Sequence, residues 1–226
     1  MRENLRRIIL LSIAVIVACV VGYYFLDIPV LRFFLEERNS TLRNIFGVIT
    51  PLGLSTPYLV LSALAFLWFR YAHKKIVFSN AALFVFVSVA AAGIANSLFK
   101  FVLARCRPTL LISDNLYGFK FFAAGYAYNS FPSGHANTIT ALLVSLYLVL
   151  RGYKFIYVLI ALPILLSRVV IGSHYLSDVI FGPYLAFMIT LLVKDAFDKH
   201  GLKISPDRFI PASPGSSFQE NQSASR

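Results

Sequence analysis

The sequence predicts an all-α integral membrane protein with six transmembrane helices and an amphipathic segment between the first and second spans. Of its 226 residues, 58% are hydrophobic and 14% are charged, whereas soluble domains are roughly 45–50% apolar and about 25% charged. Several apolar runs also approach the roughly 20 residues that cross a bilayer. We therefore expect one membrane domain over residues 1–200 and a disordered cytoplasmic tail over residues 201–226, which are rich in Ser, Pro, Asn and Gln.

The first span is expected at residues 8–26, after the basic residues Arg2, Arg6 and Arg7. Its length and the lack of a small-residue cleavage site favour an uncleaved span over a secretory signal. Residues 27–46 are more polar and carry large apolar residues at helical spacing, which predicts an amphipathic helix on the membrane. A break and a new helix cap are expected at residues 39–41. The other five spans are predicted at about 48–69, 76–99, 135–150, 155–171 and from after His174 to about 193.

The net charge of +11 comes largely from short basic clusters between the apolar runs. With six spans, both chain ends and four of these clusters fall on one side, which the positive-inside rule assigns to the cytoplasm. No basic surface interleaved with aromatic residues is found, so nucleic-acid binding is not expected. The two isolated cysteines form no disulfide framework and no metal-binding spacing. The four clusters are Arg2/Arg6/Arg7, Arg70/Lys74/Lys75, Arg151/Lys154 and Lys194/Lys199/Lys203.

The stretch SRVVIGSHYLSD at residues 167–178 carries Arg168, His174 and Asp178 between apolar runs. Ionisable residues at membrane depth are costly and indicate a functional site. His174 and Asp178 are four residues apart and share one face if the segment after Gly172 is helical. The carboxylate then holds one imidazole nitrogen and leaves the other free to react. The alternative is a buried His–Asp pair whose side chains hydrogen-bond each other and have only a structural role.

Two further stretches, residues 100–108 and 132–135, can form one site with residues 167–178. Ser133 and Gly134 in the sequence PSGH stand where the fourth span begins, and a helix N-terminus after such a turn offers free backbone N–H groups to an anion. Lys100 and Arg107, together with Arg168, add three positive charges, and arginine forks match the oxygens of a phosphate. Such basic residues can instead anchor span ends in the lipid headgroups. The conjunction of the three stretches favours a phosphate site.

The patterns KxxxxxxRP at residues 100–108, PSGH at 132–135 and SRxxxxxHxxxD at 167–178 resemble the three-part signature of the type 2 phosphatidic acid phosphatase family. That family shares its active-site pattern with vanadium-dependent haloperoxidases. The match covers about the middle third of the chain, in the right order and at every pattern position. The resemblance implies a bacterial membrane lipid phosphatase that uses no metal or other cofactor.

The resemblance also implies roles for the residues. His174 is the expected nucleophile, which forms a phosphohistidine, and Asp178 orients it. His135 is expected to protonate the leaving alkoxide and then to activate water. The expected substrate is a lipid phosphate or pyrophosphate on the periplasmic face of the inner membrane: phosphatidylglycerol phosphate, undecaprenyl pyrophosphate, phosphatidic acid or lipid A. The phosphoryl oxygens are expected to be bound by Lys100, Arg107, Ser133, Gly134 and Arg168.

Several alternatives remain open at the level of sequence. A phosphotransferase of the same family would pass the phosphoryl group to an acceptor lipid through the same phosphoenzyme. A vanadate-binding haloperoxidase is disfavoured by the membrane spans, and a non-catalytic lipid-binding protein by the intact His135, His174 and Asp178. Arg105 and Lys120 either recognise a headgroup or are solvated. The aromatic run 117–122 either covers the site or anchors in the interface. The sequence carries no signal for the headgroup or the oligomeric state.

Overall fold

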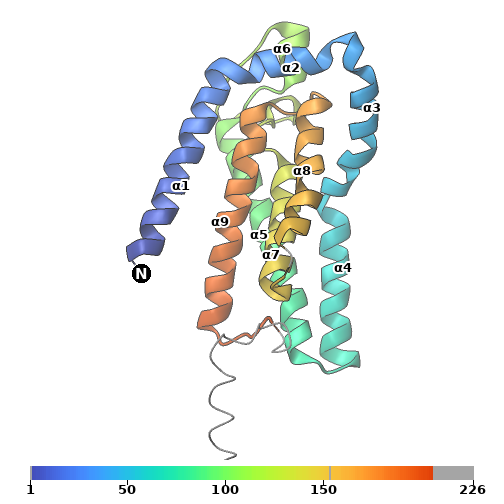
Figure 1. Ribbon diagram of the computed structural model, residues 1–226, viewed down its shortest axis with the longest axis vertical. Helices are drawn as coiled ribbons and strands as arrows, with labels where there is room; N and C mark the ends of the chain where they lie inside the picture. Colours follow the sequence, from blue (N-terminus) through green and yellow to red (C-terminus); the bar gives the residue numbers. More distant parts are fainter. Residues whose placement is uncertain (1, 153, 206–226) are drawn as a thin grey trace, which may run out of the picture.

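The computed structural model describes residues 2–152 and 154–205, and all the regular secondary structure in these ranges is helical (Figure 1). In this part of the chain, four helical segments are long and apolar enough to span a membrane: Leu5–Leu35, Ser40–Ala72, Ile76–Leu103 and Leu176–Lys199. Two further apolar helices, α7 (Gly134–Leu150) and α8 (Lys154–Val170), have 17 residues each. A helix of this length covers about 25 Å, slightly less than the ~30 Å hydrocarbon core. The all-helical membrane architecture is therefore confirmed, while the count of six spans stays a prediction.

The N-terminal half begins with α1 (Arg2–Val21), which a π-helical turn, η1 (Gly22–Leu26), connects to α2 (Asp27–Leu35). α2 crosses the upper end of the molecule in Figure 1. After the turn η2 (Glu37–Asn39), α3 (Ser40–Ile49) runs down the side of the bundle and packs against α8. The predicted break at residues 39–41 is found, and it divides the expected amphipathic segment into two helices with different directions.

A short 3-10 turn, η3 (Thr50–Gly53), separates α3 from α4 (Ser55–Leu67). Pro51 lies in this turn, and proline is accommodated at the first positions of a helical turn because its missing N–H has no partner there. α4 continues into the π turn η4 (Trp68–Ala72) and packs along α5 (Ile76–Leu103). α5 reaches beyond the predicted end of the third span and stops where Ala104 adopts a left-handed conformation, with φ of 44°.

The centre of the molecule is formed by α5, α7, α8 and α9 (Leu176–Lys199), while α1 lies outside against α9 (Figure 1). Small residues allow the helices of this bundle to approach closely. A Cβ atom added to Gly182 on α9 would lie 2.8 Å from the carbonyl oxygen of Ser133. This close crossing brings the start of α7 beside the start of α9.

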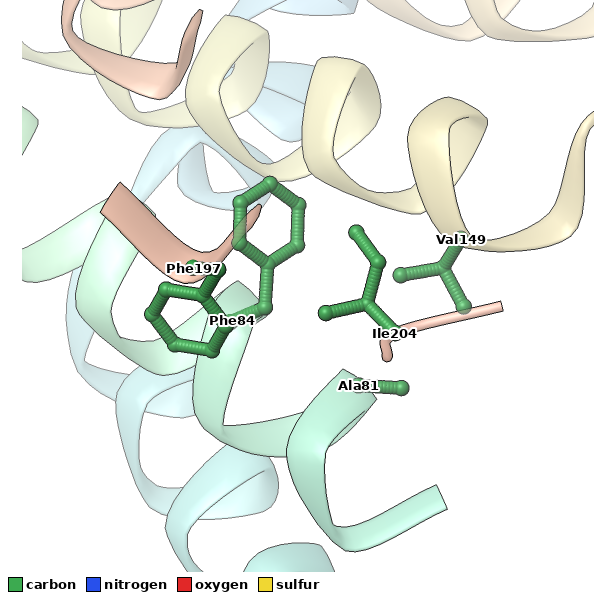
Figure 2. Packing of buried hydrophobic residues seen from close by; sticks show 5 residues of the cluster. All are labelled: Ala81, Phe84, Val149, Phe197 and Ile204. Atoms are coloured by element: carbon green, nitrogen blue, oxygen red, sulfur yellow. The ribbon is translucent and has the colours of Figure 1, made fainter. Parts of the chain in front are cut away.

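A hydrophobic cluster closes the lower end of the bundle, where α5 begins and α7 and α9 end (Figure 2). Phe84 and Phe197 meet edge to face with ring centroids 5.4 Å apart, a contact that contributes about 0.5–1.5 kcal/mol beyond burial. Ile204 is buried in the same cluster. The packed part of the chain therefore extends past residue 200, whereas disorder was predicted from residue 201 onward. The rest of the predicted tail, residues 206–226, lies outside the described ranges.

Candidate active site

The three stretches selected from the sequence meet at the upper end of the bundle. Backbone hydrogen bonds join them: the N–H of Ser133 donates to the carbonyl of Asp178, and the N–H of His174 donates to the carbonyl of Arg168, both at 3.1 Å. Lys100 Nζ and Arg107 Nη2 donate to the carbonyl of Asn129, at 2.6 and 3.2 Å. The last turns of α5 and α8 and the first turns of α7 and α9 thus form one site.

His174 lies in a turn rather than in a helix, because Gly172 adopts a φ of 67° and α9 begins only at Leu176. The helical spacing expected for His174 and Asp178 is therefore not what brings them together. The nearest partner of His174 Nδ1 is the carbonyl of Ser130 at 2.7 Å, with Asp178 Oδ2 at 3.5 Å. Since a carbonyl can only accept, Nδ1 carries the proton and Nε2 keeps its lone pair.

The surroundings of His174 keep its ring neutral. Its side chain is 2% exposed, and burial lowers the pKa of His174 from 6.5 to about 3, despite the opposing effect of Asp178. Desolvation disfavours the charged imidazolium more than one nearby carboxylate favours it. A neutral imidazole with a free Nε2 lone pair is the form that a nucleophile requires.

Asp178 is fully buried and accepts hydrogen bonds from three groups. Arg105 Nη1 donates at 2.5 Å, Ser130 Oγ at 2.6 Å and the N–H of Tyr175 at 2.9 Å. As the third residue of α9, Asp178 also faces the positive end of the helix dipole. Ser130 contacts both members of the pair, through its carbonyl and its hydroxyl, and no sequence pattern had singled it out.

Lys100, Arg107 and Arg168 form no ion pair with a carboxylate in residues 2–152 and 154–205. They are held instead by neutral groups. Arg107 donates to the carbonyls of Tyr126 at 3.0 Å and Ser173 at 3.2 Å, and Arg168 donates to Thr50 Oγ1. Three partly buried cations without a counter-charge create a strong positive potential, which favours a bound anion.

The first turn of α7 adds hydrogen-bond donors to this potential. Ser133 stands at the N-cap position, but its side chain makes no capping hydrogen bond. Its Oγ atom is buried and has no hydrogen-bond partner among the described residues. The hydroxyl and the N–H groups of this helix turn are therefore available to a ligand with oxygen acceptors.

His135 packs against η3, the turn that contains Pro51 and Gly53. A Cβ atom on Gly53 would stand 2.6 Å from His135 Cβ and 2.8 Å from its Cδ2. Gly134 and His135 also line a largely apolar cavity of about 690 Å³ between α4, α5 and α7. Thr50 and Gly53 are thus site residues that the sequence did not reveal, because only the tertiary structure brings η3 under α7.

Arg105, which the sequence left open, is 0% exposed and pairs with Asp27 as well as with Asp178. Burial alone would lower the pKa of Arg105, but the two carboxylates raise it above the ordinary value. An arginine enclosed in this way cannot contact a lipid headgroup. Lys120 is exposed, and in the aromatic run Tyr117 stacks on Tyr23 with centroids 4.8 Å apart.

In the described ranges, no group of three or more His, Cys, Asp or Glu side chains is arranged to hold a metal ion. The site combines a neutral buried histidine, a second histidine and three uncompensated cations at one end of a membrane helix bundle. These features are the ones expected of a membrane-embedded phosphatase. The sequence model of the PAP2 superfamily matches residues 81–201, more than half of the chain. The chain belongs to this superfamily, the type 2 phosphatidic acid phosphatases, and is a membrane lipid phosphatase.

Individual relatives agree with this assignment. The chain is 29% identical over 184 residues to a lipid A 1-phosphatase of Rhizobium etli, a match that covers 76% of this chain and 79% of the relative. A lipid A 1-phosphatase of Rhizobium johnstonii is 32% identical over 126 residues, which cover 55% of this chain and 52% of that protein.

Two crystal structures share the fold. The PAP2-type phosphatidylglycerolphosphate phosphatase of Bacillus subtilis superposes with a TM-score of 0.61 at 21% identity and covers 85% of this chain and 96% of that one. LpxE of Aquifex aeolicus superposes with a TM-score of 0.55 at 19% identity and covers 77% and 98% of the two chains. At these identities the likeness concerns the fold alone.

Proposed function

We propose that this protein removes a phosphate group from a membrane lipid in two steps, through a phosphohistidine on His174. The observation that carries the proposal is the hydrogen bond from His174 Nδ1 to the Ser130 carbonyl. This bond fixes the tautomer in which Nε2 is the free nucleophile. Asp178, behind the ring, offsets the positive charge that develops on the imidazole when the phosphorus–nitrogen bond forms.

In the first step, Nε2 of His174 attacks phosphorus, the bond from phosphorus to the lipid oxygen breaks, and His135 donates a proton to the departing alkoxide. In the second step, neutral His135 takes a proton from water, the water oxygen attacks phosphorus, and the phosphorus–nitrogen bond breaks to release inorganic phosphate. A residue that serves as acid and then as base regains its first state after each cycle.

Phosphoryl transfer depends mainly on positioning and on stabilising the charge on the equatorial oxygens. Lys100, Arg107 and Arg168 supply positive charge for these oxygens, and Ser133 supplies a hydroxyl donor. The absence of a carboxylate partner for the three cations in the described ranges supports this role, because a counter-ion would compete with the substrate. Gly134 allows the start of α7 to come close to the phosphoryl group.

Lipid A that carries a 1-phosphate is the substrate that we propose first, since both sequence relatives are named for this activity. The cavity of about 690 Å³ that reaches His135 is lined mainly by apolar residues of α4, α5 and α7. It suits the lipid portion next to the phosphate. Phosphatidylglycerol phosphate, undecaprenyl pyrophosphate and phosphatidic acid are the alternatives.

We also propose that the chain crosses the inner membrane six times and that the site faces the periplasm. The basic clusters at residues 70–75 and 194–203 lie toward the lower end of the bundle, and the site lies at the upper end (Figure 1). This separation of charge supports a cytoplasmic lower end.

The decisive experiment measures inorganic phosphate release by the purified protein in detergent, with the four lipids as separate substrates and EDTA present throughout. We expect release from one lipid class, and at least a thousandfold loss in His174→Ala, as for the removal of other catalytic nucleophiles. The matched control is His200→Ala, which removes an exposed histidine at the end of α9. Release that persists in His174→Ala contradicts the phosphohistidine mechanism.

A lipid phosphotransferase is the second candidate, because the same phosphoenzyme can pass its phosphoryl group to an acceptor lipid. This activity would be identified by two results together. No phosphate is released from any lipid alone, and a labelled phosphoryl group is transferred when a second lipid is added. Dephosphorylation without any acceptor identifies the hydrolase.

A further inference from the structure

We propose that Asp27 and Arg105 are positioning residues that form, with Asp178, a buried charged triad behind the nucleophile. This inference rests on the proposed function of His174. The triad holds the Asp178 carboxylate in a fixed orientation and leaves a net charge of −1 beside the imidazole. No sequence pattern connects Asp27 with the site, because it lies 151 positions before Asp178 in the chain.

The guanidinium of Arg105 bridges the two carboxylates. Nη1 donates to Asp178 Oδ1 at 2.5 Å and to Ser177 Oγ at 2.7 Å, while Nη2 donates to Asp27 Oδ2 at 2.7 Å. All three charged side chains are 0% exposed. In a site of low dielectric constant, breaking such a pair leaves an uncompensated charge at high cost. The orientation of Asp178 therefore depends on Arg105 and, through Arg105, on Asp27.

Aromatic rings enclose the same guanidinium. Its central carbon lies between 4.4 and 5.5 Å from the ring centroids of Tyr23, Tyr117, Phe119 and Tyr175. Each ring face adds a favourable cation–π contact and excludes water. Arg105 thus acts only through Asp178 and touches no substrate.

Asp27 is brought to the triad by the π turn between α1 and α2. Its Oδ1 accepts a hydrogen bond from the backbone N–H of Ser177 at 2.9 Å, and its Oδ2 accepts one from the Ser177 hydroxyl at 2.5 Å. Asp27 therefore caps the first turn of α9 from another part of the chain, at the positive end of its dipole. Gly22 in this turn lies against α9, where a Cβ atom would come within 3.1 Å of Ser177 Cβ. The π turn, a feature often found at functional sites, fits both contacts.

The second carboxylate has an electrostatic consequence. If Arg105 paired with Asp178 alone, the two charges would cancel and the imidazole would face a neutral pair. Because Arg105 shares one positive charge between two carboxylates, one negative charge remains for the imidazolium-like ring of the phosphoenzyme. In a buried site this charge is only weakly screened, so it favours the attack of Nε2 on phosphorus.

The test compares three variants, Asp27→Asn, Arg105→Gln and the double variant, in phosphate release from whichever of the four proposed lipids, presented in detergent micelles, the wild type hydrolyses. We expect Asp27→Asn to lower kcat about tenfold and Arg105→Gln about a hundredfold, with KM changed less than about twofold, as for a loss specific to the transition state. In Arg105→Gln the two buried carboxylates repel each other and displace Asp178. The double variant removes this repulsion, restores the net charge of −1 and is expected to be faster than Arg105→Gln alone. Such rescue follows from the charge balance and not from a general loss of structure.

The matched controls are Asp114→Asn and Arg38→Gln, which remove an exposed carboxylate and an exposed cation near the same end of the bundle. Both are expected to retain the wild-type kcat. The melting temperature and the size-exclusion profile in detergent give the folded fraction, to which every rate is normalised.

If Asp27→Asn and Arg105→Gln are as active per folded molecule as the controls, the positioning role of the triad is contradicted. The proposed function is then unaffected. A raised KM at unchanged kcat also overturns the inference, because it indicates contact with the headgroup. A double variant slower than both single variants contradicts the charge balance. A wild type that releases no phosphate from any of the four lipids contradicts the proposed function itself, and this outcome is distinct from the other three.

Discussion

At the scale of single residues, the site is defined by which polar atoms have partners and which do not. His174, Asp178 and Arg105 are buried with their polar groups engaged, apart from Nε2 of His174 and Nε of Arg105. Ser133 Oγ is buried without a partner in the described ranges. Buried polar groups are usually satisfied. Ser133 Oγ is one of several buried atoms without a partner in the described ranges, and its position at the start of α7 fits the phosphate-binding role that we propose for it.

We predict that Ser133→Ala lowers activity without lowering stability. Loss of the hydroxyl removes a donor to the phosphate, but it also removes a buried group whose lack of a partner costs about 1–3 kcal/mol. Phosphate release should fall about tenfold or more, while the melting temperature in detergent stays equal or rises. The control is Ser88→Ala on α5, another buried serine without a partner in the described part of the chain. A melting temperature that falls only in Ser133→Ala would show that the hydroxyl is structural.

The burial of His174 makes a second prediction at this scale, on the pH dependence of stability. The pKa of His174 falls from 6.5 to about 3 on folding, so between these pH values the unfolded chain binds a proton that the native state does not. The contribution of His174 to the free energy of unfolding is therefore complete above pH 6.5. It decreases as the pH falls below this value, by up to about 1.4 kcal/mol per pH unit.

The measurement compares chemical denaturation of the wild type and of His174→Gln between pH 7 and pH 5. The unfolding free energy of the wild type should decrease relative to that of His174→Gln as the pH falls, because glutamine does not titrate. A difference that is constant over this range would contradict the buried neutral histidine.

At the scale of elements, the 3-10 turn η3 contributes to the site in a way that was not predicted from the sequence. Pro51 and Gly53 lie in this turn, which also places Thr50 beside Arg168 and provides a surface for His135. Close approach of backbone to a side chain requires glycine. The break in the helix is therefore part of the site.

We predict that Gly53→Ala lowers kcat about tenfold or more while most of the protein stays folded. The new methyl group would stand within 2.9 Å of three His135 atoms, including Cβ, which cannot move without its backbone. Phosphate release and the melting temperature give the two readouts. Gly47→Ala on α3 is the control, because nothing lies within 4 Å of its Cβ position, and alanine favours a helix. Equal kcat in the two variants would show that His135 needs no support from η3.

At the scale of the whole molecule, the separation of the site from the basic clusters predicts how the protein lies in the membrane. We expect a membrane-impermeant thiol reagent to label Ser113→Cys on α6 (Pro108–Asp114) in intact cells. His200→Cys at the opposite end should react only after the inner membrane is opened, because the positive-inside rule assigns this end to the cytoplasm. The unmodified protein gives the background, since its Cys106 is buried and Cys19 is half-buried. The reverse labelling pattern would overturn the proposed orientation.

The sequence by itself determined the class of fold and most of the residues of the candidate site. Apolar runs predict membrane helices wherever they occur, because hydrogen bonds within a helix satisfy the backbone locally. The motifs around Lys100, His135 and His174 consist of residues close in sequence, and a resemblance over short patterns can identify them. The helix ends of α5, α7 and α8 accordingly fall within a few residues of the prediction.

The tertiary structure decided the contacts between distant parts of the chain. Ser130 at His174, Gly53 at His135 and Asp27 at Arg105 depend on how helices cross and turn. A buried charge or imidazole takes whatever partner packing brings within about 3 Å, and no local pattern encodes that partner. For this reason the sequence predicted a pairing of His174 with Asp178 alone, and only the folded bundle revealed the carbonyl and the arginine that orient them.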